Sequence, residues 1–315
     1  MDRFELSRKS LLQRAAFLAG TYAVSGILPS GLRAGDTLSP RPGRKYSTDH
    51  DLTEVKGDDP YAITVRAVEL LGGMDRFVKK GDIVVVKPNI AWNRKPEYAA
   101  NTNPRVVAAL VKMARDAGAR RVRVFDNPCN AIRMTYENSG IAAAARDAGA
   151  EVIYPADWKY RPGRFSSGSP MNEWPINSDA VECDCFINVP VAKDHRLTTL
   201  TLSMKNLMGV CGGQRGLMHR NINTSLVDLT RFIKPDLTVI DAYRILVKNG
   251  PSGGNLNDVR TPKTVTASSD PVLADAHAAG FFNIDPSRIE HVVMASRAGL
   301  GSMNMSAAGI RRESL

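Results

Sequence analysis

The chain has 315 residues, a formal net charge of +10, and few aromatic side chains among an ordinary share of apolar ones. This length and composition fit a large globular domain with a real core, and they exclude a disordered or membrane-embedded protein. Half of the excess charge lies in residues 1–45, which hold eight Lys/Arg and three Asp/Glu. Because the remainder has no long basic run with interleaved aromatics, nucleic-acid binding is disfavoured, whereas an anionic small ligand is favoured.

Residues 1–36 have the layout of an export signal and leader. A basic start that includes Arg8 and Lys9 precedes an uncharged apolar stretch over residues 15–28, and small residues lead to a cleavage position at Ala34. The start resembles the twin-arginine consensus, with Lys9 in place of the second arginine. We predict export to the bacterial periplasm, with the export machinery as a partner. The mature chain has no predicted membrane span, and an N-terminal amphipathic helix of a cytosolic protein is the alternative.

Helices and strands alternate after a Pro- and Gly-rich linker over residues 37–57. Apolar spacing predicts helices over 61–71, 103–117 and 141–148, with β-branched strands over 82–87, 121–125 and 151–154. This β-α-β rhythm predicts an α/β fold with a mostly parallel doubly wound sheet and helices on both faces.

A Pro-, Ser- and Gly-rich stretch over residues 158–178 predicts a long loop or a small insertion. The rhythm then resumes with strands over 185–189 and 237–240 and helices over 198–208 and 223–233, followed by a β-α-β unit over 264–267, 271–282 and 289–294. The main domain is expected to span residues 58–301. Residues 302–315 lack periodicity and are expected to form a C-terminal tail.

The four cysteines lie in no zinc-ribbon or iron–sulfur spacing, and buried small side chains are their favoured interpretation. Disulfides among Cys129, Cys183, Cys185 and Cys211 stay open. No close histidine pair or Glu-x-x-His motif occurs, so a metal site is disfavoured, and any cofactor is unknown.

Polar residues follow several predicted strands, at the edge of a parallel sheet where ligands bind. They are Lys87 and Asn89, Asp126, Lys193 and His195, and Asp241. Lys193 and His195 precede a predicted helix, and Lys205 lies near the end of that helix. Two cations and a histidine near a helix N-terminus would form an anion site.

Two of these side chains are candidates for chemistry. The imidazole of His195 has an ordinary pKa near neutrality and is the candidate acid/base. Lys205, beside Asn206 and apolar neighbours, would be desolvated into a base or nucleophile, although a solvated face is equally compatible with the pattern. A glycine-rich loop then leads to His219.

The order of several strings resembles the domain of unknown function 362 family over residues 58–301. The strings are Val86-Lys87-Pro88-Asn89, Ile187-Asn188-Val189-Pro190, Lys193-Asp194-His195, Met204-Lys205-Asn206-Leu207-Met208-Gly209, Asp241-Ala242 and Ser269-Asp270-Pro271. The chain departs from the family pattern at Val191, where a lysine is usual, and it lacks the cysteine run of relatives with an iron–sulfur domain. The resemblance implies an α/β domain and no established activity.

We therefore expect an exported α/β protein that binds an anionic small molecule in a cleft lined by lysines and histidines. The resemblance adds Asp270 to the candidate ligand-binding residues. Whether the protein is an enzyme stays open. The alternatives are a periplasmic metal or cofactor carrier that uses His195 and His219, and an accessory protein of a redox complex.

Overall fold

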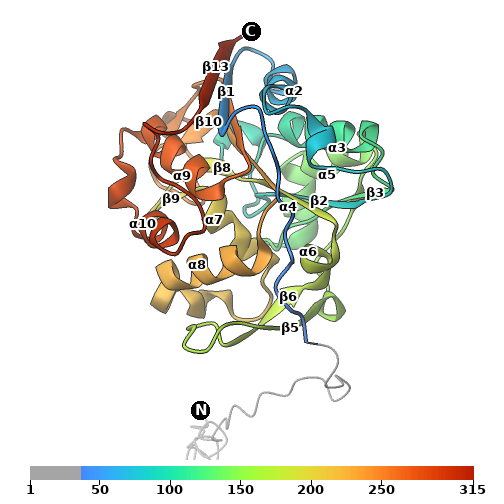
Figure 1. The fold of residues 1–315 in the computed structure, drawn as a ribbon, viewed down its shortest axis with the longest axis vertical. Helices are drawn as coiled ribbons and strands as arrows, with labels where there is room; N and C mark the ends of the chain where they lie inside the picture. The colour runs from blue at the N-terminus through green and yellow to red at the C-terminus, as the bar shows by residue number, and fades with distance from the viewer. Residues whose placement is uncertain (1–36) are drawn as a thin grey trace, which may run out of the picture. The chain divides into compact units, whose positions relative to one another are not determined.

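The computed structural model describes residues 37–315, and the predicted export signal over residues 1–36 lies outside the described residues. The described residues form a sheet of 11 strands with helices on both faces (Figure 1), together with a separate 2-stranded sheet. Within this part of the chain, no helix is both long and apolar enough to cross a membrane.

The parallel half of the large sheet has a doubly wound strand order. On one side of β2 (Ile83–Pro88) lie β3 (Arg121–Val124) and then β4 (Glu151–Val152). On the other side lie β7 (Cys185–Val189) and then β10 (Leu237–Leu246), and all four pairings are parallel. The winding therefore reverses between β2 and β7, where open α/β sheets bind their ligands. The predicted fold class is confirmed.

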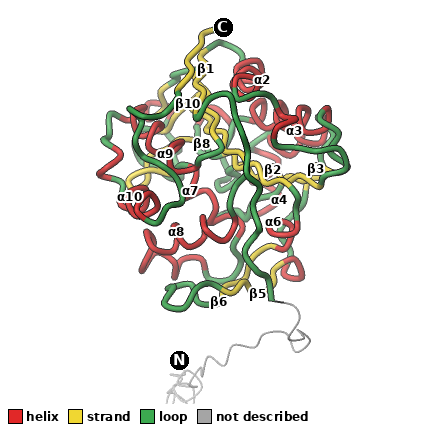
Figure 2. The backbone as a smooth tube through the Cα atoms, in the orientation of Figure 1, coloured by secondary structure: helices red, strands yellow, loops and turns green. Residues whose placement is uncertain are grey.

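Three further strands complete the other edge of the sheet. β12 (Thr264–Ser268) runs antiparallel to β10, and β1 (Leu52–Lys56) runs antiparallel to β12. The last strand, β13 (Ile310–Ser314), pairs parallel with β1 (Figure 2). The predicted linker and tail thus each contribute a strand. The local sequence pattern does not predict these two short strands, because each is stabilised by a partner strand more than 200 residues away along the chain.

Adjacent residues of β2 point into different cores because side chains alternate across a strand. Val84 belongs to the core under α2 (Pro60–Leu70), α3 (Pro104–Asp116) and α5 (Ile141–Asp147). Val85 belongs to the core under α8 (Ile222–Ile233) on the opposite face. The remaining helices and strands outside the regions described next are α4 (Ile132–Asn138), α6 (Ser178–Glu182), α9 (Pro271–Ala279) and β11 (Val259–Arg260).

The predicted helix over residues 198–208 is wrong in its first half. Val191–His195 forms β8, which turns back into β9 (Thr199–Thr201), and helix α7 spans only Ser203–Asn206. The hairpin pairs Lys193 with Thr201 across its two strands. Threonines favour a pleated strand over a helix, and this preference prevails where a partner strand is available.

The segment over residues 158–178, predicted as a long loop or a small insertion, contains a hairpin of β5 (Tyr160–Arg164) and β6 (Glu173–Asn177). One further segment differs from expectation. The predicted strand over 289–294 is a helix, α10 (Glu290–Arg297). Its buried positions Val292 and Ala295 are three residues apart, a helical spacing that the apolar run obscured.

Candidate functional site

A cleft of about 870 Å³ lies beyond the ends of β2 and β3 and along β8, next to the point where the sheet reverses its winding. Eight of the ten predicted site residues line it, although they come from five separate stretches of the chain. They are Lys87, Asn89, Asp126, Lys193, His195, Lys205, Asn206 and His219.

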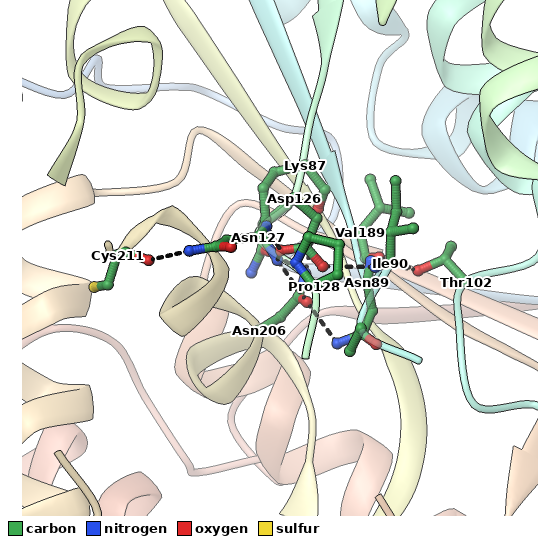
Figure 3. Close-up of polar contacts among 12 residues, drawn as sticks. Lys87, Asn89, Ile90, Thr102, Asp126, Asn127, Pro128, Val189, Asn206 and Cys211 are labelled. Carbon is green, nitrogen blue, oxygen red and sulfur yellow. Dashed lines mark hydrogen bonds and ion pairs between the residues drawn. The ribbon is translucent and has the colours of Figure 1, made fainter. Parts of the chain in front are cut away.

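The floor of the cleft holds a buried ion pair. Lys87 Nζ lies 2.8 Å from Asp126 Oδ1, and both side chains are almost fully buried (Figure 3). Asp126 also accepts hydrogen bonds from the backbone N–H groups of Ile90 and Asn127 at 2.6 and 2.9 Å. Burial lowers the pKa of Lys87, and the Asp126 carboxylate opposes that shift. The positive charge of Lys87 is therefore balanced by a carboxylate of the protein itself.

Gly209 is the residue that makes room for this pair. A β-carbon at this position would lie 1.7 Å from Asp126 Oδ1 and 2.5 Å from Lys87 Nζ. Such contacts are far inside van der Waals distance and involve a buried ion pair that cannot swing into solvent. The glycine at the end of the Met204–Gly209 string is therefore required by close approach.

A chain of amides connects Lys87 to Lys193. Asn206 Oδ1 accepts from Lys87 Nζ at 2.8 Å and from Asn89 Nδ2 at 3.0 Å. Asn89 Oδ1 in turn accepts from Lys193 Nζ at 3.0 Å, and the same ammonium donates to the Ala100 carbonyl at 2.6 Å. Each asparagine uses both ends of its amide, so the two lysines are held in fixed positions.

Three cations of the cleft are held by neutral acceptors. Lys193 has the amide and carbonyl just described, Lys205 donates to Met208 Sδ at 3.0 Å, and Arg215 donates to the carbonyls of residues 127 and 128. Asp126 is the single carboxylate among the described residues that line the cleft, and it is paired with Lys87. The cleft therefore carries excess positive charge.

Burial and mutual repulsion weaken the basicity of these lysines. Burial lowers the pKa of Lys193 to about 7, and nearby Lys205 contributes in the same direction. Burial also lowers the pKa of Lys205 to about 8, with further lowering from Arg215 and Lys87. The predicted desolvation of Lys205 is present, and burial brings the pKa of both lysines close to neutral pH.

Two histidines face the same cleft from different elements. His195 ends β8, and His219 lies in a 3₁₀ turn over Arg215–Asn221. Their ring centroids are 6.4 Å apart and their planes differ by 5°. Burial and the nearby Lys205 lower the pKa of His195 to about 3, and burial with Lys205 lowers that of His219. Both shifts favour the neutral form of the ring.

The other two predicted residues do not line the cleft. Asp241 is buried, and its carboxylate accepts from the backbone N–H groups of Asn103 and Tyr243. Asp270 caps the N-terminus of α9 through the N–H groups of Val272 and Leu273. Both carboxylates therefore satisfy backbone donors, a role common for aspartate after a strand or before a helix.

Sequence reasoning missed Arg215, Trp92 and Cys129, which also line the cleft. Arg215 belongs to the glycine-rich loop before His219 and follows no predicted strand, so the strand-end pattern does not include it. Trp92 and Cys129 follow the strand-end residues by only a few positions, so extending the strand-end rule would have included them.

The cysteines and the possible metal ligands have these positions among the described residues. All four cysteines are free, and three of them are buried while Cys129 is exposed. Over residues 37–315, no group of three or more His, Cys, Asp or Glu side chains could hold a metal ion.

Comparisons with known proteins give a family and distant structural relatives. The family model described as "Domain of unknown function (DUF362)" matches residues 84–280. A thylakoid-associated protein of Synechocystis sp. is 30% identical over 243 residues, covering 74% of this chain and 73% of that protein.

Two solved structures are similar over part of their length. The lactate racemase apoprotein of Thermoanaerobacterium thermosaccharolyticum is 13% identical, with a TM-score of 0.46 over 78% of this chain and 61% of that chain. A Thermotoga maritima protein is 11% identical, with a TM-score of 0.42 over 72% and 60%. The chain thus spans about three fifths of both solved proteins.

Proposed function

Since this chain belongs to the domain of unknown function 362 family, we propose from the geometry of its cleft that it binds an anionic small molecule there, as an exported periplasmic protein. The observation that carries the proposal is the excess of cations. Lys193, Lys205 and Arg215 form no ion pair with a carboxylate of the described residues. A carboxylate or phosphate would supply the missing negative charge and accept charge-assisted hydrogen bonds.

The cleft also has the size and lining of a small-molecule site. Its volume lies within the roughly 300–1,000 Å³ of ligand pockets. Apolar groups of Trp92, Leu197 and Met208 share its wall with the cations. This mixture fits an organic anion whose carbon skeleton contacts the apolar wall while its charged end lies among the lysines.

Thermal unfolding in the presence of citrate, malate or inorganic phosphate tests the proposal. A ligand at about 100 times its dissociation constant adds roughly 2.7 kcal/mol to the free energy of unfolding. We expect at least one anion to raise the unfolding temperature of the native chain. The shift should disappear in Lys193→Met and Lys205→Met and persist in Lys112→Met, a control on the exposed face of α3. A shift unchanged by the cleft substitutions would refute the assigned site, and no shift with any anion would refute the function.

Export rests on residues 1–36 alone and needs its own test. In a bacterial host, we expect the full chain to yield a periplasmic product that begins after Ala34. Substitution of Arg8 and Lys9 by Gln should retain the precursor in the cytoplasm, whereas Lys9→Arg should not impair export. A cytoplasmic native chain with an intact N-terminus would contradict the proposal.

The metal- or cofactor-carrier alternative receives less support. His195 and His219 approach each other, but among residues 37–315 no group of three or more His, Cys, Asp or Glu side chains could hold a metal ion. Metal analysis of the purified native protein separates the two functions, because a stoichiometric metal would favour the carrier.

A further inference from the structure

The backbone fixes the tautomer of His195. Its Nδ1 atom lies 3.2 Å from the backbone N of Leu197 and 3.3 Å from that of Thr198, in the turn between β8 and β9. A backbone N–H can only donate, so Nδ1 must be the unprotonated acceptor. The neutral ring then carries its proton on Nε2, which is a hydrogen-bond donor.

The opposite tautomer is fixed at His219. Its Nδ1 atom lies 3.1 Å from the carbonyl oxygen of Gly216. A carbonyl can only accept, so Nδ1 carries the proton and donates. The Nε2 atom of His219 is therefore left with a lone pair. A histidine held through Nδ1–H with a free Nε2 is arranged as a general base.

The surroundings keep both rings neutral without changing these tautomers. Lys205 and Arg215 face His219, and Lys193, Lys205, His219 and the buried His291 face His195. None of these neighbours is an anion that would favour an imidazolium. The two rings share the cleft at a centroid distance of 6.4 Å, so one substrate can contact both.

We infer that His219 is the proton acceptor of this cleft and that His195 is a fixed hydrogen-bond donor to a substrate oxygen. The inference rests on the proposed anion site and deepens it. The substrate class is a carboxylate or phosphate with an ionisable O–H or C–H group next to an oxygen. The proton passes to His219 Nε2, the electron pair remains on the substrate and is stabilised by His195 Nε2–H, and His219 later returns the proton.

This assignment gives His195 a role different from the predicted acid/base role. To accept a proton at Nε2 from its neutral state, His195 would first have to move its proton to Nδ1. That atom would then face two backbone N–H donors at hydrogen-bond distance. The Nε2 atom of neutral His219 is already unprotonated, so it can accept a proton without a change of tautomer.

Diethyl pyrocarbonate tests the inference on the native protein without a substrate, because it acylates the unprotonated nitrogen of an imidazole. Peptide mapping after treatment at pH 7.5 should show His219 modified at a rate similar to that of the partly exposed reference His50. His195 should react at least tenfold more slowly. Equal reactivity of His195 and His219, or an unreactive His219, would overturn the assignment.

A spectroscopic measurement gives an independent answer. Long-range ¹H–¹⁵N spectra of histidine-labelled protein at pH 7.5 should show a protonated Nε2 at His195 and a protonated Nδ1 at His219. His195→Gln and His219→Gln variants assign the signals, and the native spectrum remains decisive if a variant fails to fold. Reversed tautomers would overturn the inference while leaving anion binding intact. Correct tautomers with no anion-induced thermal shift would instead refute the proposed function, and with it the substrate class, while leaving the tautomer assignment intact.

Discussion

At the scale of single residues, the three cleft lysines differ in the groups that their side-chain nitrogens contact. Lys87 has a carboxylate, Lys193 has an amide and a carbonyl, and Lys205 has a thioether. A buried ammonium without a counter-ion is costly, and a bound anion lowers that cost. Lys87 therefore belongs to the framework of the site, whereas Lys193 and Lys205 are suited to bind the ligand.

Asp126→Asn tests the structural role of the buried pair. The substitution leaves Lys87 without a carboxylate at a fully buried position, so we expect the free energy of unfolding to fall by roughly 3–5 kcal/mol. Urea denaturation measures this loss. The control is Asp116→Asn, which breaks the exposed Lys112–Asp116 pair on α3 and should change stability by less than about 1 kcal/mol. Equal effects of the two substitutions would show that the buried pair has no special role.

At the scale of elements, the short helix α7 depends on a residue of another helix. The residue before α7 supplies no side-chain cap. Asp275 of α9 instead accepts from the backbone N–H groups of Ser203 and Met204 at 2.6 and 3.0 Å. Because α7 carries Lys205 and Asn206, this tertiary cap positions one wall of the cleft.

Asp275→Ala should therefore affect both stability and binding. It leaves two buried N–H groups without an acceptor, at a cost of roughly 1–3 kcal/mol each. We expect a lower unfolding temperature and a reduced anion-induced thermal shift. The matched control is Asp270→Ala, which removes the cap of α9 outside the cleft and should cost about 1 kcal/mol. If Asp275→Ala lowers stability as expected but leaves the anion-induced thermal shift as unchanged as Asp270→Ala does, α7 does not position the anion site.

At the scale of the whole molecule, the cleft cations oppose folding in the absence of a ligand. Lys193 and Lys205 have folded pKa values of about 7 and 8, below the ordinary value of 10.5. Burial also raises the pKa of Asp275 to about 7, so its carboxyl opposes the lysines near that pH. Above pH 7, as Asp275 loses its proton, the unfolded chain holds more protons than the folded chain, and stability rises with pH. This rise ends where the buried thiols Cys183 and Cys211 begin to oppose it, because burial raises their pKa from 9.0 to about 12.

We accordingly expect the free energy of unfolding to increase between pH 7 and 8.5 in the unliganded native protein. Urea titrations at several pH values measure the slope. The Lys193→Met, Lys205→Met double variant should show a much smaller slope, whereas Lys112→Met should retain the native one. Stability that falls with pH over this window would contradict the shifted lysines.

Local patterns in the sequence determined the α/β class, the parallel core strands and the strand-end location of most site residues. Apolar periodicity and the carboxyl-end rule are local or topological properties, so they can be recognised without coordinates. The pattern failed for β9 and α10, where apolar or threonine-rich runs are compatible with both a helix and a strand. It also missed β1 and β13, whose pairing partners are distant.

Only the tertiary structure decided how the site residues differ from one another. It paired Lys87 with Asp126, left Lys193 and Lys205 with neutral partners, and excluded Asp241 and Asp270. Protonation states and tautomers depend on which donors, acceptors and charges lie within a few ångströms, and the sequence does not contain those distances. The residue types of the candidate site were therefore predictable, whereas the contacts of each side chain required the fold.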